Sequence, residues 1–444
     1  MKRLNKYVNF MEVEDGCFIF DISSSTAIAV HPEIFNLIKD HYANIEEIQA
    51  IHPDLYESLV MSKVIVDSDC DETQMLRERY NAIDCDPSSF SIIVNPTLEC
   101  NLRCWYCYEN HKKQSRMTDE TLSAIKKLIA TKTNSPELKN LLMSFFGGEP
   151  ILGWNNVVRP LLKYSVDKCN ERGINFSTAF TTNGVLLTDE KTDMLLDLGL
   201  KNTSFQITID GNRTFHDFSR IGASKAPTYD VIMRNVEKTA LKGFTINLRF
   251  NYTPDTIDSF IDVLSDIKNM PVEAQWHIRC SVEKVWQSGN EDTRNQALSV
   301  IHTFQNAGIS TSSDILYNRH HCYADRENNI VVNYNGDIFK CTAREFSPSA
   351  REGILNRDGT LSLNERYHKR MALKYSSPIC KSCSIMPLCN GHCSQSKLER
   401  ELSDSCPMGY DESSKKDVLI GALYQTVFNK TIELKKNRKI VPAN

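Results

Sequence analysis

Residues 98–108 decide the fold, and they read Leu-Glu-Cys-Asn-Leu-Arg-Cys-Trp-Tyr-Cys-Tyr. They place three thiols, Cys100, Cys104 and Cys107, directly after an apolar run that is typical of a strand. A closed zinc site needs four protein ligands, and disulfides need cysteines in pairs. A four-iron cluster held by only three cysteines keeps one iron open for a substrate or cofactor atom. The loop therefore favours a cluster with one open coordination site.

The bulk composition predicts a globular cytoplasmic protein. The chain has 444 residues, 41% apolar and 24% charged, which is enough for about three domains. Its net charge of −4 argues against nucleic acid as the main partner. Because no apolar run is long enough to cross a membrane and no secretion signal follows Met1, we expect no membrane partner either.

The 15 cysteines fall into two tight groups and a scattered remainder of Cys17, Cys70, Cys85, Cys169 and Cys280. Grouped cysteines in a cytoplasmic protein are typical of metal sites rather than disulfides. The scattered ones are expected to fill cores. Cys280, at the end of the sixth strand predicted below, has two interpretations, as core filler or as a residue of the reaction site.

Residues 1–70 predict a small winged-helix-like α+β domain. Strand-like runs cover 7–13, 17–22 and 26–30, helices follow at 31–38, 45–51 and 55–61, and a last strand covers 63–66. The charged segment 71–89 is expected to be a linker.

Residues 90–310 repeat a strand-helix pattern six times. The predicted strands are 90–95, 141–146, 175–180, 204–209, 245–250 and 273–279, each followed by a helical pattern. Such an alternation predicts an α/β fold in which a parallel sheet closes into a partial, TIM-like (β/α)6 barrel. Functional groups of parallel barrels lie at the carboxyl ends of the strands.

The loops after the first four strands were therefore searched for such groups. After the three cysteines, the second loop offers Gly147, Gly148 and Glu149, where paired glycines let backbone approach a ligand. The third and fourth loops and the segment beyond offer Asn183, Thr208, Asp210 and Arg220. Ordinary turn chemistry is the alternative for the Asn-Gly and Asp-Gly pairs.

Residues 311–410 hold the second cysteine group, and 411–444 form a final helix and tail. The group consists of Cys322, Cys341, Cys380, Cys383, Cys389, Cys393 and Cys406. Two strand-like runs joined at Asn335-Gly336 predict a hairpin before Cys341. A pair of zinc sites is the alternative for this group.

The cysteine loop and the glycine loop together resemble the radical S-adenosylmethionine (radical SAM) superfamily. The match is the CxxxCxxC spacing after the first barrel strand, with Tyr106 as the aromatic residue before the third cysteine. The resemblance implies a 4Fe-4S cluster on Cys100, Cys104 and Cys107. It also implies S-adenosylmethionine (SAM) beside Gly147, Gly148 and Glu149, with Thr208 near its ribose and further contacts from Asn183, Asp210 and Arg220. The implied chemistry is reductive cleavage of SAM to a 5′-deoxyadenosyl radical, under anaerobic conditions.

The second cysteine group resembles the SPASM domain of radical SAM peptide modifiers. The resemblance implies two auxiliary 4Fe-4S clusters, the outer on Cys380, Cys383, Cys389 and Cys406, the inner on Cys322, Cys341 and Cys393. Two 4Fe-4S clusters need eight protein ligands, and this group offers seven cysteines. Either another residue completes the inner cluster, or its open iron binds a substrate thiolate.

The small N-terminal domain resembles the PqqD-like recognition domain of peptide-modifying enzymes. That likeness implies a precursor peptide whose leader adds a strand to a free sheet edge. The alternative is an ordinary subdomain packed on the catalytic core.

Three functions are weighed. The first is a radical SAM/SPASM enzyme that forms a thioether or carbon-carbon crosslink in a ribosomally made peptide, with flavodoxin or ferredoxin as electron donor. The second is an anaerobic sulfatase-maturating enzyme that makes formylglycine, against which stand Thr342 after the second SPASM cysteine and the extra N-terminal domain. The third is a non-catalytic zinc-binding or peptide-carrier protein. No catalytic acid or base is singled out.

Overall fold

The chain is described by a computed structural model that covers nine stretches of residues. They are 1–109, 111–222, 226–289, 292–312, 322–373, 376–391, 393–399, 406 and 408–440, with side chains as far as residue 427. Two compact units emerge. The terminal unit comprises residues 1–83, 315–322 and 373–444, and the barrel unit comprises residues 84–314 and 323–372. No helix among the described residues is long and apolar enough to cross a membrane.

The terminal unit begins with the predicted small sheet. Its elements are β1 (Lys2–Leu4), β2 (Val8–Val13), β3 (Gly16–Asp21), β4 (Thr26–Val30), α1 (Pro32–Asp40), α2 (Ile48–Ile51), α3 (Pro53–Met61) and β5 (Ile65–Asp67). Strands β2, β3 and β4 are antiparallel in that order, and β1 pairs with β5. Val8 and Ile19 on one face of the three-stranded sheet pack with Ile38, Ile48 and Leu59 of the helices.

The other face of this sheet is covered by segments that come much later in the chain. Met11 and Phe20 share a core with Leu76, Met386 and Leu423. These last three belong to α4 (Glu72–Asp84), α14 (Met386–Cys389) and α16 (Glu412–Ile440). Helix α4 therefore occupies most of the segment 71–89 that composition predicts to be a linker, because Leu76 gives that charged stretch an apolar contact. The remaining elements of this unit's later part are η7 (Pro378–Lys381) and α15 (Ser394–Glu399).

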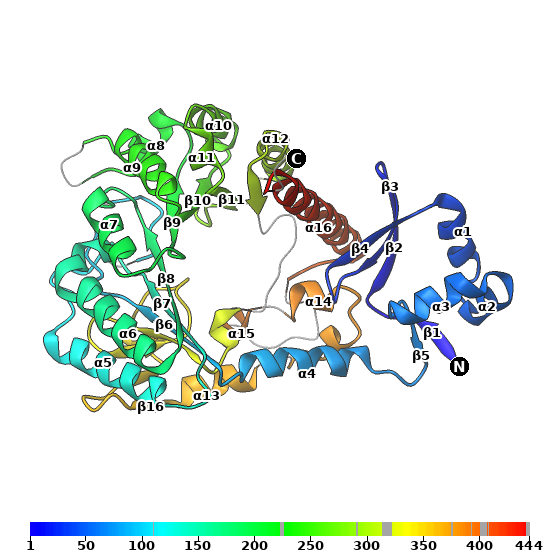
Figure 1. The fold of residues 1–444 in the computed structure, drawn as a ribbon, viewed down its shortest axis with the longest axis horizontal. Coiled ribbons are helices and arrows are strands. Elements are labelled where there is room, and N and C mark those ends of the chain that lie inside the picture. The colour runs from blue at the N-terminus through cyan, green and yellow to red at the C-terminus, as the bar shows by residue number, and fades with distance from the viewer. Residues whose placement is uncertain are drawn as a thin grey trace. The chain divides into compact units, whose positions relative to one another are not determined.

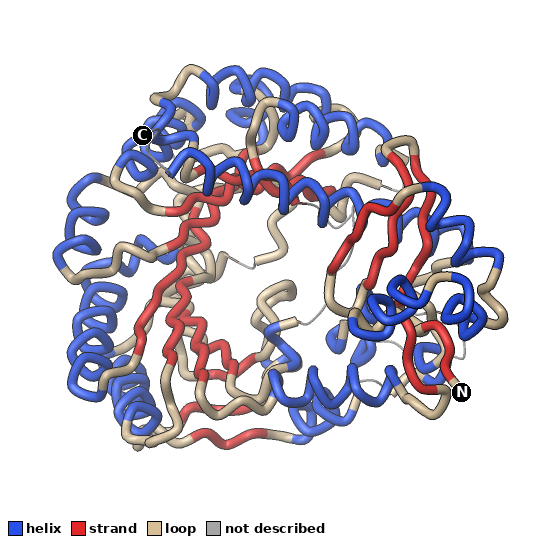
Figure 2. The backbone as a smooth tube through the Cα atoms, turned by 45° about the vertical axis from the view of Figure 1, so that its right-hand side comes forward, coloured by secondary structure: helices blue, strands red, loops and turns tan. Residues whose placement is uncertain are grey.

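The barrel unit contains the predicted parallel sheet with helices outside it (Figure 1, Figure 2). Its strands are β6 (Ser89–Val94), β7 (Asn140–Phe145), β8 (Asn175–Thr182), β9 (Ser204–Ile209), β10 (Thr245–Tyr252), β11 (Ile278–Lys284) and the short β12 (Ser310–Ser312). Its helices are α5 (Asp119–Thr133), α6 (Arg159–Arg172), α7 (Asp189–Asp197), α8 (Arg213–Ser219), α9 (Tyr229–Leu241), α10 (Phe260–Lys268), α11 (Val272–Gln275) and α12 (Arg294–Asn306). Neighbouring strands from β6 to β12 pair in sequence order and in parallel, which confirms the partial-barrel prediction.

Buried and less buried side chains alternate along β6, β7, β9 and β10. In β10, Leu248 and Phe250 are buried, whereas Asn247, Arg249 and Asn251 are half-buried. Since one face of each strand packs on the helices, the polar set lies on the concave face. The concave face is therefore lined by amide and guanidinium groups at β10.

The sixth strand lies further along the chain than the sequence predicts, so the predicted strand 273–279 was wrong. Pro271 introduces a helical turn, α11, and β11 begins only at Ile278. Cys280 consequently lies inside the strand and pairs in register with Leu248 on the helix-facing side. Complete burial raises the pKa of its thiol. Of the two interpretations of Cys280, the structure thus favours a side chain that fills the core over a residue of the reaction site.

The segment after the barrel extends the same sheet. Its elements are β13 (Asn329–Val332), β14 (Asp337–Phe339), β15 (Gly353–Leu355), β16 (Leu361–Leu363) and α13 (Glu365–Ala372). Strand β13 pairs in parallel with β6, and β14 folds back on it through the predicted Asn335-Gly336 turn, where Gly336 has φ +83°. Cys341 follows β14 directly.

A buried ion pair fixes α13 to this extension and gives a test of it. Arg370 donates to both carboxylate oxygens of Glu352 at 2.8 and 2.7 Å, and both side chains are almost fully buried. Arg370→Met leaves Glu352 unpaired, so we expect the free energy of unfolding to fall by about 3–5 kcal/mol in urea titrations. The control Arg351→Met removes a half-exposed pair with Asp337 and should cost about 1 kcal/mol or less. Equal losses in the two variants would refute this assignment.

Candidate functional site

The cysteine loop, residues 98–109, lies beyond the carboxyl end of β6, where a parallel barrel places its chemistry. Cys100, Cys104 and Cys107 are free and half-buried there. Burial raises the pKa of Cys100 to about 12 and that of Cys107 to about 11, and the neighbouring Cys104 thiol adds to both shifts. The three sulfurs are therefore stable as thiolates only when metal cations compensate their charge.

The donor set fits an iron-sulfur cluster. The Leu102 N–H donates to the Cys100 sulfur at 3.4 Å, a contact that stabilises a metal-bound thiolate. Among the described residues, no three His, Cys, Asp or Glu side chains lie close enough together to hold a single metal ion. The chemistry and spacing of its thiols fit a cluster on the cysteine loop, and Cys100, Cys104 and Cys107 stay its predicted ligands.

The glycine loop packs directly on the cysteine loop. Gly147 has φ +108°, and a Cβ on Gly148 would lie 2.2 Å from the Glu99 carbonyl oxygen. The Gly148 N–H donates to the Thr97 carbonyl at 3.1 Å, and the Glu149 N–H donates to Glu99 at 2.8 Å. Only glycine at 148 permits this backbone approach.

Glu149 connects the glycine loop to the third strand end. Its fully buried carboxylate accepts hydrogen bonds from the Ile151 N–H at 3.0 Å, the Thr182 hydroxyl at 2.8 Å and the Asn183 N–H at 2.8 Å. Burial raises the pKa of Glu149, and these donors oppose the rise. The geometry gives Glu149 a positioning role, and its contact with SAM stays a prediction.

Asn183 lies against the cysteine loop as predicted for a site residue. Its Nδ2 donates to Asn101 Oδ1 at 2.7 Å and lies 3.8 Å from the Cys100 sulfur. Its Oδ1 accepts from the Val185 N–H at 3.0 Å. The third strand end is thus fastened to the first.

Tyr106 is held at its hydroxyl by a buried polar network. The hydroxyl lies 2.8 Å from both oxygens of Asp210, and accepts from Arg220 Nη1 at 2.7 Å and from Asn251 Nδ2 at 3.2 Å. Arg220 also pairs with Asp210 at 3.7 Å. Burial raises the pKa of Asp210, and the Arg220 charge opposes that rise.

Arg220 places a positive charge beside the cysteine loop. Its charge lowers the pKa of Cys100, Cys104 and Cys107 against the larger effect of their burial. Its buried Nε has no hydrogen-bond acceptor among the described residues. A ligand carboxylate would satisfy that donor, which fits the amino-acid part of SAM.

The structure brings the predicted residues of the first three loops together with Tyr106, Asp210 and Arg220, while Thr208 lies half-buried on the concave face, in register with Arg249. Sequence reasoning missed Asn101 and Asn251. The alternation of polar residues along β10 is a sequence signal that places Asn251 on the concave face.

The segment after Cys341 is fastened to the cysteine loop. The Tyr108 hydroxyl donates to the Thr342 carbonyl at 2.9 Å, and the Tyr108 ring stacks on Trp286 with ring centroids 5.8 Å apart. Thr342 also shares a 2.6 Å hydroxyl contact with Tyr323, the residue after Cys322. The Ala343 N–H donates to the Cys341 sulfur at 3.3 Å.

The other SPASM cysteines belong to the terminal unit. Burial raises the pKa of Cys383, and the Cys380 and Cys406 thiols add to the shift, so these three sulfurs are neighbours. Their proximity agrees with the expected outer cluster, which stays a prediction.

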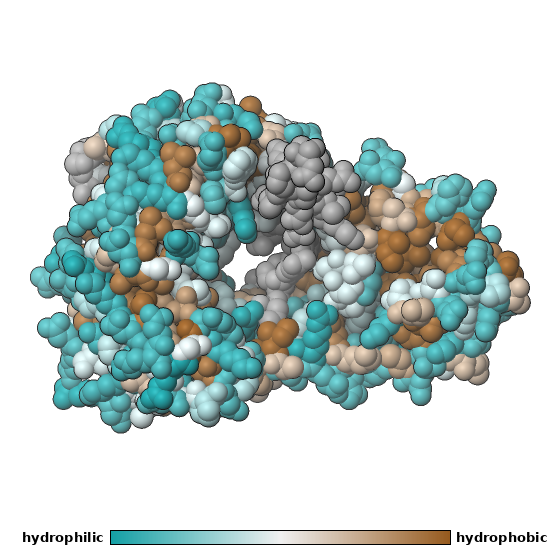
Figure 3. Space-filling view, viewed as in Figure 1, coloured by the Kyte–Doolittle hydropathy of each residue, from teal (hydrophilic) through white to brown (hydrophobic). Residues whose placement is uncertain are grey.

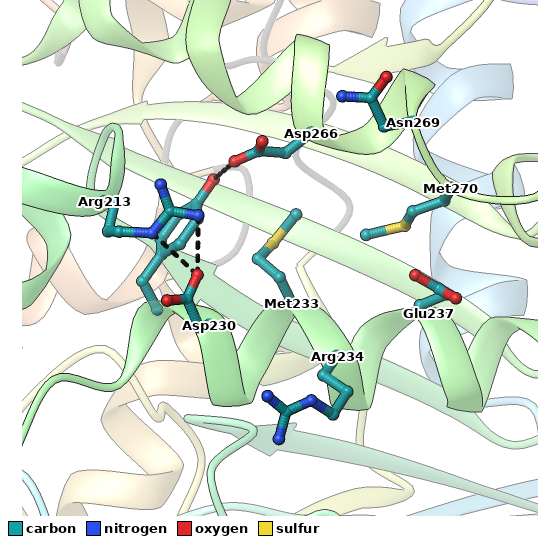
Figure 4. Close-up of a pocket in the computed structure, with 9 residues that line it drawn as sticks. Arg213, Asp230, Met233, Arg234, Glu237, Asp266, Asn269 and Met270 are labelled. Atoms are coloured by element: carbon teal, nitrogen blue, oxygen red, sulfur yellow. Dashed lines mark hydrogen bonds and ion pairs between the residues drawn. The ribbon is translucent and has the colours of Figure 1, made fainter.

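A cavity of about 410 Å³ lies outside this site, between α9 and α10 on the helix layer (Figure 4). Arg213 pairs with Asp230 at 2.8 Å at one end of it, and Tyr229 donates to Asp266 at 2.7 Å. None of the predicted site residues lines it.

Known proteins share this architecture. The model of the radical SAM superfamily matches residues 94–267. A serine-type anaerobic sulfatase-maturating enzyme of Bacteroides thetaiotaomicron is 24% identical over 72% of this chain and 86% of its own length. The radical SAM cyclopropyl synthase TigE of Paramaledivibacter caminithermalis is 24% identical over 88% of this chain and 89% of its own. The structure of Streptococcus suis SuiB bound to precursor peptide SuiA has a TM-score of 0.50 at 14% identity, covering 93% of this chain and 99% of that one.

These matches confirm the predicted fold class and identify the chain as an enzyme. The family implies a 4Fe-4S cluster and SAM as cofactors. The non-catalytic zinc-binding or peptide-carrier alternative loses its support.

The close approach of the two loops predicts the effect of one methyl group. Gly148→Ala pushes a Cβ into the Glu99 carbonyl, so we expect the cysteine loop to shift and the reconstituted protein to hold about four fewer irons per chain. Gly243→Ala is the control, because its Cβ meets open space although its φ is +88°. Iron and sulfide analysis with EPR of the reduced protein measures both, and full iron loading of Gly148→Ala would contradict the packing argument.

Proposed function

We propose that this chain is a radical SAM enzyme that modifies a ribosomally made peptide by forming a thioether or carbon-carbon bond. The observation that carries the proposal is a small sheet whose uncharged edge strand, β4, pairs only with β3 among the described residues. This sheet occurs in the same chain as the predicted radical SAM site. The residues 26–30 of this strand are Thr-Ala-Ile-Ala-Val.

The edge of β4 has the properties of a peptide-binding strand. Natural edge strands are blunted by charges, proline or bulges, and β4 has none of these in its sequence. Ile28 is 41% exposed on the face that α1, α2 and α3 cover only in part. Figure 3 shows apolar side chains gathered over the small sheet and α1. An extended leader peptide can add a strand here and gain main-chain hydrogen bonds.

The site residues then divide into two tasks. When bound, the cluster and SAM supply a 5′-deoxyadenosyl radical that takes one hydrogen atom from the peptide. The glycine loop, Glu149 and Asn183 hold the cysteine loop at the strand ends, and the Tyr106 network holds it from the β9 and β10 side. The polar concave face of β10 lies next to that network, where it can orient the peptide.

The proposed reaction takes up one electron at its start and releases one electron when the new bond closes, so it uses no net electron. An external donor such as flavodoxin or ferredoxin would supply the electron that the bound cluster and SAM need for this chemistry. The peptide loses one hydrogen atom to the radical, and closing the new bond releases a proton and an electron. Cys380, Cys383, Cys389 and Cys406 would hold the outer auxiliary cluster, and Cys322, Cys341 and Cys393 would hold the inner one. The chemistry that these clusters would supply is acceptance of that electron.

Relatives support this class of substrate. SuiB is described in complex with its precursor peptide, and the likeness to it covers 93% of this chain. TigE is named for cyclopropyl synthesis, which favours the carbon-carbon product over the thioether. A peptide substrate fits both.

Formylglycine synthesis is the second candidate, because the sulfatase-maturating relative aligns over 86% of its length. Thr342 stands where those enzymes usually carry an acidic residue, and its backbone and hydroxyl are bonded to Tyr108 and Tyr323. The two functions differ in product. Formylglycine is an aldehyde, whereas a crosslink has no reactive carbonyl.

We expect a short cysteine-bearing peptide to be encoded beside this gene. The decisive experiment incubates that peptide anaerobically with the enzyme, SAM and a reductant. We expect a loss of two hydrogens per crosslink by mass spectrometry and no reaction of the product with a hydrazide. Because serine oxidation to formylglycine also removes two hydrogens, hydrazide labelling separates the candidates. A labelled product, or an unchanged peptide, refutes crosslinking.

A substitution on β4 tests leader binding separately from chemistry. Ile28→Lys places a charge at the free edge, and we expect the leader peptide to bind at least about fivefold more weakly by fluorescence anisotropy. SAM cleavage without peptide should be unchanged. The control Met61→Lys adds the same charge at a 79% exposed position of the same domain. Equal leader affinity for Ile28→Lys and the unmodified protein would exclude β4 as the binding edge.

A further inference from the structure

Glu109 is a buried carboxylate for which the described residues provide no hydrogen bond. The residue is 8% exposed, and neither of its carboxylate oxygens has a partner among the described residues. It ends the cysteine loop, two positions after Cys107. An unsatisfied buried polar group destabilises a protein, and a charged one does so more strongly. Such a group at the mouth of a barrel indicates a ligand that supplies the missing donor.

The other buried carboxylates of the barrel unit discussed above are satisfied by the fold. Glu149 accepts three hydrogen bonds, Asp210 is bonded to Tyr106 and pairs with Arg220, and Glu352 is paired with Arg370. In these three cases the barrel unit therefore provides hydrogen-bond donors or an arginine for the buried carboxylate. Glu109 differs from all three because the described protein leaves both of its oxygens without a donor.

The charges around Glu109 place it away from the predicted SAM contacts. Arg220 influences Cys100, Cys104, Cys107, Tyr106, Glu149 and Asp210. The charged group near Glu109 is instead Glu345, which lies four residues after Cys341. Tyr108, the residue before Glu109, is hydrogen-bonded to Thr342 of that same segment. A second carboxylate there makes an external hydrogen-bond donor more favourable.

We propose that Glu109 binds the peptide substrate by accepting hydrogen bonds from its N–H groups, between the cysteine loop and the segment after Cys341. The inference rests on the proposed function for the identity of the ligand. A peptide carries a backbone N–H at nearly every residue and can satisfy two acceptor oxygens at once. Donors on SAM have the same chemistry, and the experiment separates the two sources.

The test compares Glu109→Leu and Glu109→Gln with the unmodified full chain, after anaerobic reconstitution to equal iron content. Leucine has a similar size but no acceptor, and glutamine keeps one acceptor oxygen. Urea unfolding without ligand gives stability, and fluorescence anisotropy and equilibrium dialysis give the Kd values of the precursor peptide and of SAM. None of these readouts depends on turnover.

We expect Glu109→Leu to be at least as stable as the unmodified protein, because it removes an uncompensated buried acid. We expect its Kd for the peptide to rise at least tenfold and its Kd for SAM to stay unchanged. Glu109→Gln should show a smaller rise. If Glu109→Leu does not load iron, the test rests on Glu109→Gln alone. We then expect the Kd of that variant for the peptide to rise at least threefold.

The proposal fails if the variants bind the peptide as tightly as the unmodified protein. It also fails if only the Kd for SAM rises, since the donor then belongs to the cofactor. A marked loss of stability in Glu109→Leu would show that a group of the protein itself is bonded to Glu109, and this result would also overturn the proposal. Glu237→Leu, which alters a side chain of the outer cavity in Figure 4, is the matched control and should change neither Kd.

The two proposals can fail separately. A peptide that binds but is not modified overturns the proposed function, while the comparison of peptide Kd values still decides the role of Glu109. An unmodified protein that binds no peptide overturns both.

Discussion

The buried carboxylate of Glu149 is the contact on which the geometry of the site depends. It accepts hydrogen bonds from its own loop and from Thr182 and Asn183, so a single side chain joins the second and third strand ends. The backbone beside it is hydrogen-bonded to Thr97 and Glu99. Three loops are thereby fixed to one another before any ligand is present, which is what preorganisation of a cofactor site requires.

The cysteine loop is also held from its opposite flank. Tyr106 is anchored at its hydroxyl by Asp210, Arg220 and Asn251, and Tyr108 is anchored at its hydroxyl by Thr342. Neighbouring side chains of one short loop therefore connect the barrel to the segment that carries Cys341. A displacement of that segment would be transmitted to the loop through Tyr108, because packed and hydrogen-bonded contacts are stiff.

Much of this architecture could be predicted from sequence because it depends on patterns of residues that lie close together in the chain. The strand-helix period defined the barrel, and the spacing of Cys100, Cys104 and Cys107 defined the site. The sixth strand was predicted too early in the chain because apolar residues alternate from Val272 to Trp276, as they do in a strand. In the structure, Pro271 starts a helical turn there. Asn251 and Glu109 could not be assigned by motif, because their roles depend on burial and on partners distant in sequence.

The shared core of the terminal unit sets an order of assembly during synthesis. Met11 and Phe20 emerge from the ribosome early, but Met386 and Leu423, which cover them, are made roughly 370 residues later or more. At roughly 5–20 residues per second, this apolar face has only the early contact with Leu76 of α4 and lacks its later contacts for roughly 20–80 s. Part of this apolar face is therefore exposed, and the nascent chain is prone to aggregation, until the segments that carry Met386 and Leu423 have been synthesised.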